Sequence, residues 1–508
     1  MGNAAPGRTD ETLLPRPAGP VPASGGHDDA ARSAAAGAQL PGVTPGAPPC
    51  SDPGVPLGTS STAAPATLRA AGAAVRSKKR VLAASFVGTT IEWYDFYLYG
   101  AAAALVFNHY FFPQGSGVGA VIASFATFAI AFFFRPLGGI VAGHLGDRIG
   151  RKALLVASLL AMGLATTAIG LLPGFERIGW AAVVLLVACR ILQGLSAGME
   201  WGGSAVLSVE HAPSGLRGLF GSFTQVGSAA GMLLSTAFFA VVQAATTPEQ
   251  FQAWGWRVPF LFSAVLVVIG LVIRAGVTDA EEFREVRAEE KRAVSPVREV
   301  LREYPRGVIV CIGQRMVQPA IFSILTVYTL TYVTQHRGQS QWVMVSILIA
   351  AAVGIVGGPL WGWLSDRVGR RRISGIAAAL VGVFVWPYFL FLDHGPLALL
   401  PFVYLVGLAV LHDSIYGPQA ALFAEQFPVH LRYSGVSLGY QVGTILSGGL
   451  TPMIAAWLVA RGGGTPWLLC GYLSVLAVVS VVTARMARDS VADGARAVPA
   501  AVAAPVPA

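Results

Sequence analysis

Charged side chains are scarce in this sequence. Asp, Glu, Lys and Arg together make up 12% of the 508 residues, whereas hydrophobic residues make up 54%. A soluble globular domain carries about a quarter charged residues. A chain of this length and composition would expose a large apolar surface if it folded in water, so lipid is the expected solvent for most of it.

Cysteine is scarcer still. Cys50, Cys189, Cys311 and Cys470 lie far apart and form no CxxC spacing, which argues against a disulfide framework and a zinc site. The sequence also contains no HExxH segment and no phosphate-binding loop. We therefore expect no enzyme activity, no metal and no cofactor. The net charge of +9 does not indicate nucleic acid, because the basic residues flank apolar runs.

The two ends of the chain differ from its middle. Residues 1–78 are rich in Ala, Pro and Gly, and they do not open with a basic segment followed by an apolar run. Such a segment buries too little apolar surface to offset its ordering entropy. It is expected to be disordered and cytoplasmic, with no cleavable signal peptide. A similar disordered tail is expected at 489–508, and a charged cytoplasmic linker at 277–306.

Between these segments lie apolar runs about as long as a bilayer-spanning helix, which needs about 20 residues. They lack the ten-residue alternation of a membrane barrel, so strands are not expected. The runs cover residues 81–108, 118–144, 153–173, 179–210, 217–243, 257–276, 307–334, 341–364, 373–392, 396–424, 432–460 and 466–486. The sequence therefore predicts an all-α membrane protein with twelve transmembrane helices, divided into six-helix halves at 79–276 and 307–488.

Basic residues gather in alternate loops, for example at 76–80, 148–152, 284–292 and 367–372. Cytoplasmic loops carry such an excess of Lys and Arg. We therefore expect a multi-pass protein of the plasma (inner) membrane with both termini in the cytoplasm.

The sequence repeats itself once. Residues 147–152 match 366–371, and Gln225-Val226-Gly227 matches Gln441-Val442-Gly443. At the ends of the fourth and tenth runs, Glu210, Pro213 and Arg217 match Glu425, Pro428 and Arg432. The offsets are nearly equal, so the chain is expected to consist of two six-helix halves in the same orientation, with a site at their interface.

Several motifs carry a resemblance to a known family. They are Gly146-Asp147-Arg148-Ile149-Gly150-Arg151-Lys152, its echo at 365–371, Arg190-Ile191-Leu192-Gln193-Gly194, Glu92-Trp93-Tyr94-Asp95-Phe96, Arg135-Pro136-Leu137-Gly138-Gly139, residues 198–203 and residues 254–260. Over residues 79–488 the chain resembles the major facilitator superfamily, and within it the metabolite:proton symporter family. His412-Asp413 and residues 432–435 look closest to shikimate-type transporters. The resemblance implies transport by alternating access.

One group of charges is duplicated and lies at the cytoplasmic ends of helices. A carboxylate and a basic partner there can clamp neighbouring helices and separate when the two halves move, which predicts a conformational latch. The alternative is that these residues only set the topology. The group comprises Asp147, Arg151, Glu210, Arg217, Asp366, Arg370, Glu425 and Arg432.

A second group of charges is unduplicated and lies deep in the apolar runs. A charge at the bilayer centre costs from about 2.5 to over 10 kcal/mol, so these residues must face a cavity or one another. Glu92 and Asp95 share one helix face and are predicted to couple protons. Residues predicted to bind substrate are Arg135, Arg190, Gln193, Glu200, Arg315, His412 and Asp413. Structural ion pairs are the alternative.

These features predict a proton-coupled symporter for a small polar metabolite. Buried arginines favour an organic acid such as shikimate, because a guanidinium pairs well with a carboxylate. A proline- or betaine-type zwitterion is the alternative within this class, and it would favour an aromatic cage. A membrane-embedded enzyme or a non-transporting sensor fits less well. The expected partners are the substrate, protons and the lipid bilayer, and the chain is expected to act as a monomer.

Overall fold

The computed structural model describes residues 86–112, 117–149, 151–210, 212–213, 215–275 and 296–491. All regular secondary structure in these ranges is helical. The expected N-terminal segment 1–78, most of the linker 277–306 and most of the tail 489–508 lie outside them. The side chains of Asp147, Arg151 and Glu200 are also outside the described set, although their backbones belong to helices.

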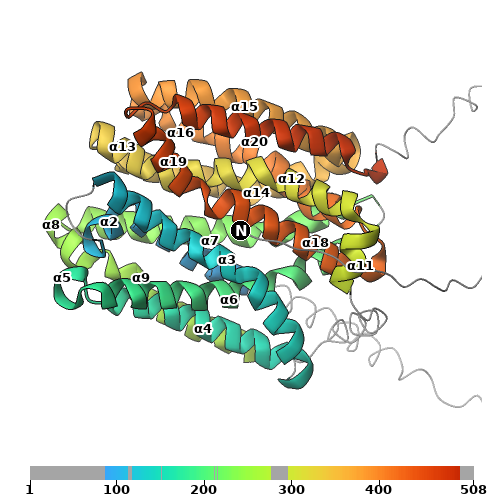
Figure 1. Cartoon of the computed structure of the whole chain (residues 1–508), viewed down its shortest axis with the longest axis horizontal. Coiled ribbons are helices and arrows are strands. Elements are labelled where there is room, and N and C mark those ends of the chain that lie inside the picture. Colours follow the sequence, from blue (N-terminus) through green and yellow to red (C-terminus); the bar gives the residue numbers. More distant parts are fainter. Residues whose placement is uncertain are drawn as a thin grey trace, which may run out of the picture. The chain divides into compact units, whose positions relative to one another are not determined.

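The first half contains six long helices, coloured blue to green in Figure 1. The first covers residues 86–102 and continues through the π-helical turn η1 (Ala103–Phe107) into α2 (Asn108–Tyr110); the others are α3 (Gly117–Ile149), α4 (Arg151–Leu171), α6 (Trp180–Glu210), α7 (Arg217–Ala245) and α9 (Arg257–Ala275). Short connecting pieces are α5 (Phe175–Ile178), α8 (Pro248–Gln250) and η2 (Phe251–Gly255).

The second half, yellow to red in Figure 1, repeats this plan after the short helix α11 (Pro296–Glu303). Its long helices are α12–η3–α13 (Pro305–Ser323, Ile324–Tyr328, Thr329–Arg337), α14 (Gln341–Val368), α15 (Arg370–His394), η4–α16–η5–α17 (Leu397–Leu399, Leu400–Tyr404, Leu405–His412, Asp413–Ala424), α18–η6–α19 (Val429–Thr444, Ile445–Gly449, Thr451–Arg461) and α20 (Trp467–Met486). The expected runs coincide with these helices.

Length and hydropathy alone identify nine spanning helices among the described residues, or ten if the bent pair Pro248–Gly255 and Arg257–Ile273 is one span. Two more complete the twelve. The first helix carries two acids and several tyrosines, which lower its hydropathy, and the apolar part of α4, Val156–Leu171, is short. The prediction of twelve transmembrane helices in two six-helix halves is confirmed, and the acids that weaken the first helix's signal are themselves candidate functional residues.

The halves approach each other most closely where α7 packs against α14. A β-carbon on Gly218 would lie 2.4 Å from the carbonyl oxygen of Gly362, and one on Gly362 would lie 2.6 Å from that of Gly218. Any side chain at either position would force the two backbones apart. Small residues allow such close contact between membrane helices, and here they bring the two halves together.

Side chains join the halves at both ends of the helices. We call these the α11 end and the α13 end, after the elements labelled there in Figure 1. At the α11 end Arg432 donates to Glu210 at 2.7 Å. At the α13 end the Thr331 hydroxyl donates to the Ala104 carbonyl at 3.0 Å. A hydrogen bond therefore joins the two halves at each end.

Candidate functional site

Arg315 of α12 is the centre of a buried polar cluster between the helices of the second half. Its Nε donates to the Thr444 hydroxyl at 2.9 Å, and its Nη1 donates to the side-chain oxygens of Gln318 and of Gln419, the latter at 2.5 Å. The Tyr440 ring lies 3.7 Å from its guanidinium carbon. Arg315 is 2% exposed, and no Asp or Glu among the described residues forms an ion pair with it. All its described partners are neutral.

The cluster continues from Arg315 to a histidine–aspartate pair. The amide nitrogen of Gln318 lies 2.6 Å from His412 Nε2, and His412 Nδ1 lies 2.8 Å from Asp413 Oδ1. His412 closes the π-helical turn η5 and Asp413 opens α17. Such wide turns shift the helical register and are frequent at functional sites. The result is an unbroken chain of polar contacts from the guanidinium to a carboxylate.

A small cavity of about 30 Å³ adjoins this chain, at the contact between the halves. His412, Asp413 and Tyr416 line it from the second half. Tyr97 and Gln225 line it from the first. A volume of this size holds about one water molecule, so the helices would have to separate to admit a metabolite.

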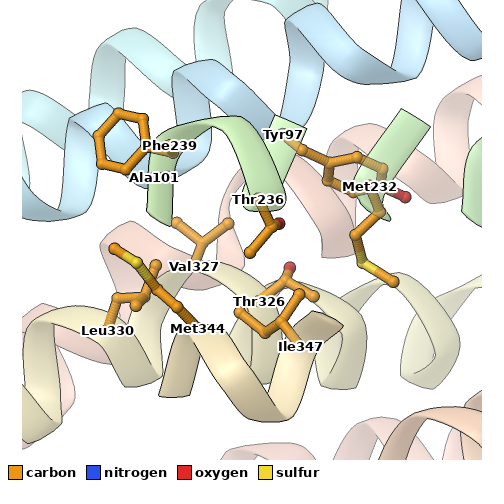
Figure 2. A pocket seen from close by; sticks show the side chains of 10 residues that line it. All are labelled: Tyr97, Ala101, Met232, Thr236, Phe239, Thr326, Val327, Leu330, Met344 and Ile347. Carbon is orange, nitrogen blue, oxygen red and sulfur yellow. The ribbon is translucent and has the colours of Figure 1, made fainter. Parts of the chain in front are cut away.

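A second cavity, of about 10 Å³, is largely apolar. Figure 2 shows side chains of α7 and of the 86–102 helix meeting those of η3, α13 and α14 across it. Met232, Phe239 and Val327 are among its lining residues. Apolar side chains of the two halves therefore meet at this cavity.

Arg135 of α3 is another buried arginine, and its described acidic contact is a long one. Its Nη2 is 4.0 Å from Glu92 Oε1, and its Nε has no hydrogen-bond partner among the described residues. The Phe132 and Phe96 rings lie 4.9 and 5.4 Å from its guanidinium carbon. Arg135 is 5% exposed, and aromatic faces stabilise such a cation only in part.

Asp95 takes a different direction from Glu92, although both are on the first helix. Its Oδ1 accepts a hydrogen bond from Ser263 of α9 at 2.7 Å, and its Oδ2 has no hydrogen-bond partner among the described residues. The structure therefore places Asp95 inside the first half. Glu92 faces Arg135 instead, so the two predicted proton-coupling acids do not face a common site.

Arg190 and Gln193 of α6 also lie inside the first half. Arg190 donates to the backbone carbonyls of Thr127 and Phe128 at 3.2 and 2.8 Å, and to the Gln193 side chain at 2.8 Å. Gln193 in turn donates to the Thr166 hydroxyl at 2.7 Å. These contacts tie α6 to α3 and α4, and they do not bring Arg190 or Gln193 into the cluster around Arg315.

Three predicted latch residues of the second half, Asp366, Arg370 and Glu425, form one network at the α11 end. Asp366 accepts hydrogen bonds from the backbone N–H groups of Gly218 and Leu219, at 2.7 and 3.0 Å, at the N-terminus of α7 in the other half. Arg370 donates to Asp366 at 2.6 Å and to Glu425 at 2.7 Å. A carboxylate at a helix N-terminus is favoured by the free N–H groups and the helix dipole, so Asp366 connects the halves.

The third described acid of the predicted latch crosses between halves. Glu210, at the end of α6, pairs with Arg432 of α18 and not with Arg217, its neighbour in sequence. Arg217 begins α7 and is exposed. Burial raises the pKa of the Glu425 carboxyl, and the Arg370 guanidinium opposes that shift.

We expect Asp366→Asn to lower the maximal transport rate about tenfold while changing the half-saturating concentration by no more than about threefold. The substitution removes a charge that bonds to two N–H groups of the other half, and a hydrogen bond to a charged group contributes about 1.5–3 kcal/mol. Initial uptake rates over a range of substrate concentrations would measure this. Asp393→Asn is the matched control, because Asp393 accepts from Tyr332 within one half. A normal maximal rate with weakened half-saturation would exclude a latch.

Two segments match the GxSxG pattern of serine hydrolases, Gly194–Gly198 and Gly435–Gly439. Both lie inside continuous helices, α6 and α18, whereas a nucleophile elbow needs a strand, a sharp turn and a helix. Ser196 donates to the Leu192 carbonyl of its own helix at 2.8 Å. Neither segment has the geometry of a nucleophile.

Sequence reasoning missed the neutral members of the cluster, Gln318, Gln419 and Thr444. An amide or hydroxyl in an apolar helix is common, so neither stands out as a charge does. One signal was present: Gln318 follows Arg315 by three residues, which places both on the same face of α12. That spacing could have identified Gln318.

Comparison with known proteins places these observations in a family. The sequence profile of the Major Facilitator Superfamily matches residues 85–439. A shikimate transporter of Escherichia coli is 40% identical over 417 residues, which are 81% of this chain and 95% of that protein. A proline/betaine transporter of E. coli is 31% identical over 415 residues, covering 80% and 82%. The crystal structure of a D-xylose-proton symporter superposes with a TM-score of 0.65 at 17% identity, covering 80% of this chain and 97% of that one.

Proposed function

The chain belongs to the Major Facilitator Superfamily and is a secondary transporter, not an enzyme, and we propose that it is a proton-coupled symporter of a small organic acid. The observation that carries this proposal is the pair Arg135 and Arg315. One comes from each half and both are buried. Arg315 has only neutral described partners, and the described carboxylate nearest Arg135 in an ion pair, that of Glu92, is 4.0 Å away.

The energetics of buried charge support an anionic cargo. An uncompensated guanidinium in a low-dielectric interior is costly, and pairing it with a carboxylate offsets much of that cost. A carboxylate held between Arg135 and Arg315 would also draw the two halves together. Substrate binding would thereby favour the closed arrangement, as alternating access requires.

The polar lining of the central cavity supports a hydroxylated acid. Shikimate, the cargo named for the E. coli relative, carries one carboxylate and three hydroxyl groups. Gln225 and Ser228 present side chains that can bond to hydroxyls when the cavity widens. His412 and Asp413 lie on the opposite wall.

A zwitterion such as proline or betaine is the second candidate. Its carboxylate would use the same arginines, and Tyr97, Phe322 and Tyr416 line the cavity where aromatic faces could hold the cationic nitrogen. A relative named as a proline/betaine transporter is 31% identical to this chain.

The remaining functional assignments are part of the same proposal. Glu92 and Asp95 carry the coupling proton, and Asp95 acts on the return of the empty carrier. The charged network at the α11 end holds that end closed. The membrane is the plasma membrane of a bacterium, which is supported by an E. coli relative named as an inner membrane metabolite transport protein.

Uptake into proteoliposomes tests the proposal. Labelled shikimate, benzoate, proline, betaine and xylose would each be offered with and without an inwardly directed proton gradient. We expect accumulation of shikimate, none of xylose, and a loss of accumulation when the gradient is collapsed by a protonophore. Accumulation of proline or betaine alone would select the second candidate. Accumulation of a neutral sugar, or no effect of the gradient, would contradict the proposal.

A further inference from the structure

The Gln318 side chain lies between the Arg315 guanidinium, which can only donate hydrogen bonds, and the His412 imidazole, which can donate or accept them. Arg315 has no acceptor, so the Gln318 oxygen must face its Nη1 and the Gln318 nitrogen must face His412. His412 Nε2, 2.6 Å from that nitrogen, must then accept. Its Nδ1 carries the proton and donates to Asp413 at 2.8 Å. This chain of contacts requires a neutral imidazole.

Protonation of His412 is incompatible with these contacts. A proton added at Nε2 would point at the NH₂ group of Gln318, donor against donor. The amide could turn over and present its oxygen to His412, but its NH₂ group would then face Nη1 of Arg315. That second conflict disappears only when Nη1 turns to another acceptor. A substrate carboxylate is such an acceptor.

We propose that the Gln318 amide makes anion binding at Arg315 and proton binding at His412 depend on each other. This inference rests on the organic-acid function proposed above. With Arg315 free of anion, Gln318 holds His412 neutral. With a carboxylate on Arg315, Gln318 turns over and accepts from the imidazolium Nε2–H, while Nδ1–H stays on Asp413. The proton passes from hydronium in solution to Nε2: an O–H bond of hydronium breaks, the N–H bond forms and a water molecule is released. Anion and proton thus load together.

The surroundings of His412 favour this exchange. Among the described residues, the charged and titratable groups around it are Asp413 and Tyr416 on its own helix, Arg315 on α12, Tyr97 on the first helix, Tyr440 on α18, and Arg135 on α3. The parts of α7 and α14 that line the adjoining cavity carry no charge. Asp413 is the single carboxylate in this set, and it contacts His412 directly. An imidazolium at His412 would therefore have an acidic partner.

The proposed role of His412 differs from that of Asp95. Asp95 contacts Ser263 inside the first half and touches neither Arg315 nor His412. Substrate binding and proton binding are thus linked by contact at Gln318, whereas Asp95 acts on the return of the empty carrier. Linkage requires that each ligand strengthens the binding of the other by the same factor.

The test is equilibrium binding of shikimate to the purified protein at a series of pH values from 5.5 to 8.5. If binding takes up one proton, the dissociation constant for shikimate rises by up to about tenfold for each unit by which the pH is increased within this range. We expect this slope in the wild type and in Asp95→Asn. We expect a flat profile in His412→Gln, which cannot take up the proton. We also expect a flat profile in Gln318→Met, which keeps the length of the side chain but removes the amide.

Gln419→Met is the matched control. Gln419 accepts from the same Nη1 of Arg315 but has no described contact with His412, so its loss should leave the slope intact even if affinity changes. A flat wild-type profile, or a slope that survives in His412→Gln or Gln318→Met, would overturn the inference and leave the anion site standing. Absence of shikimate binding at every pH would instead reject the organic-acid function, and this inference with it.

Discussion

Arg315→Gln should weaken substrate binding by about two orders of magnitude and should reduce uptake and counterflow exchange together. The proposed substrate carboxylate would lose its guanidinium partner while remaining buried among Tyr416, Tyr440 and Gln419. Breaking a buried ion pair on one side costs about 3 kcal/mol or more, and 1.4 kcal/mol corresponds to a tenfold change in affinity. Binding and both modes of transport all require the anion, so all should fall.

Calorimetric titration of shikimate and counterflow in proteoliposomes would measure this effect. Arg315→Lys keeps the charge but loses the planar fork, so an intermediate loss is expected. Arg337→Gln is the matched control, because its hydrogen bonds among the described residues go to the Leu392 and Gly395 carbonyls at the α13 end. An Arg315→Gln protein that stays folded and binds within about threefold of the wild type would remove Arg315 from the substrate site.

Asp95→Asn should abolish accumulation while leaving exchange measurable. The carboxyl group is buried, and its Oδ2 has no hydrogen-bond partner among the described residues, so the charged form is costly at this depth. Asparagine imitates the protonated acid and cannot release a proton. An empty carrier that must lose that proton to return would stall, whereas a loaded carrier could still cross in both directions.

The measurement is the steady accumulation ratio under a proton gradient of one pH unit. Each coupled proton supplies about 1.4 kcal/mol, or about tenfold accumulation, and the ratio in Asp95→Asn should fall to about one. Ser263→Ala is the control, since it removes the hydrogen bond to Asp95 but keeps the carboxyl, and it should still accumulate substrate. If Asp95→Asn accumulates, Glu92→Gln is the next variant. Accumulation by both would exclude coupling through the first helix.

The helices could be predicted closely because apolar length is a strong signal. The direction in which a charged side chain points could not be predicted from the sequence. Glu92 and Asp95 are three residues apart, so they lie about 60° apart around the helix axis. That difference is enough to turn Glu92 toward Arg135 of α3 and Asp95 toward Ser263 of α9. Depth also does not distinguish Arg315, which joins the central cluster, from Arg190, which bonds to the α3 backbone.

The repeat predicted which latch residues carry charge, but it could not predict which acid forms an ion pair with which base. Glu210 has the same charge complementarity with Arg217 as with Arg432, and only packing between the halves selects Arg432. Within the second half, Glu425 bonds to Arg370. Pairing across a repeat depends on how the two halves approach each other, which a linear pattern does not contain.

The Glu210–Arg432 pair has the form of one half of an isologous contact. In a symmetric dimer of identical units, an acid of each subunit meets a base of the other, so the same contact occurs twice. Here the equivalent acid of the second copy, Glu425, bonds to Arg370 and to the Ser490 hydroxyl at 2.7 Å. When two copies are joined in one chain, their sequences can diverge. Glu210 can therefore connect the two halves, while the equivalent Glu425 stabilises contacts within the second half.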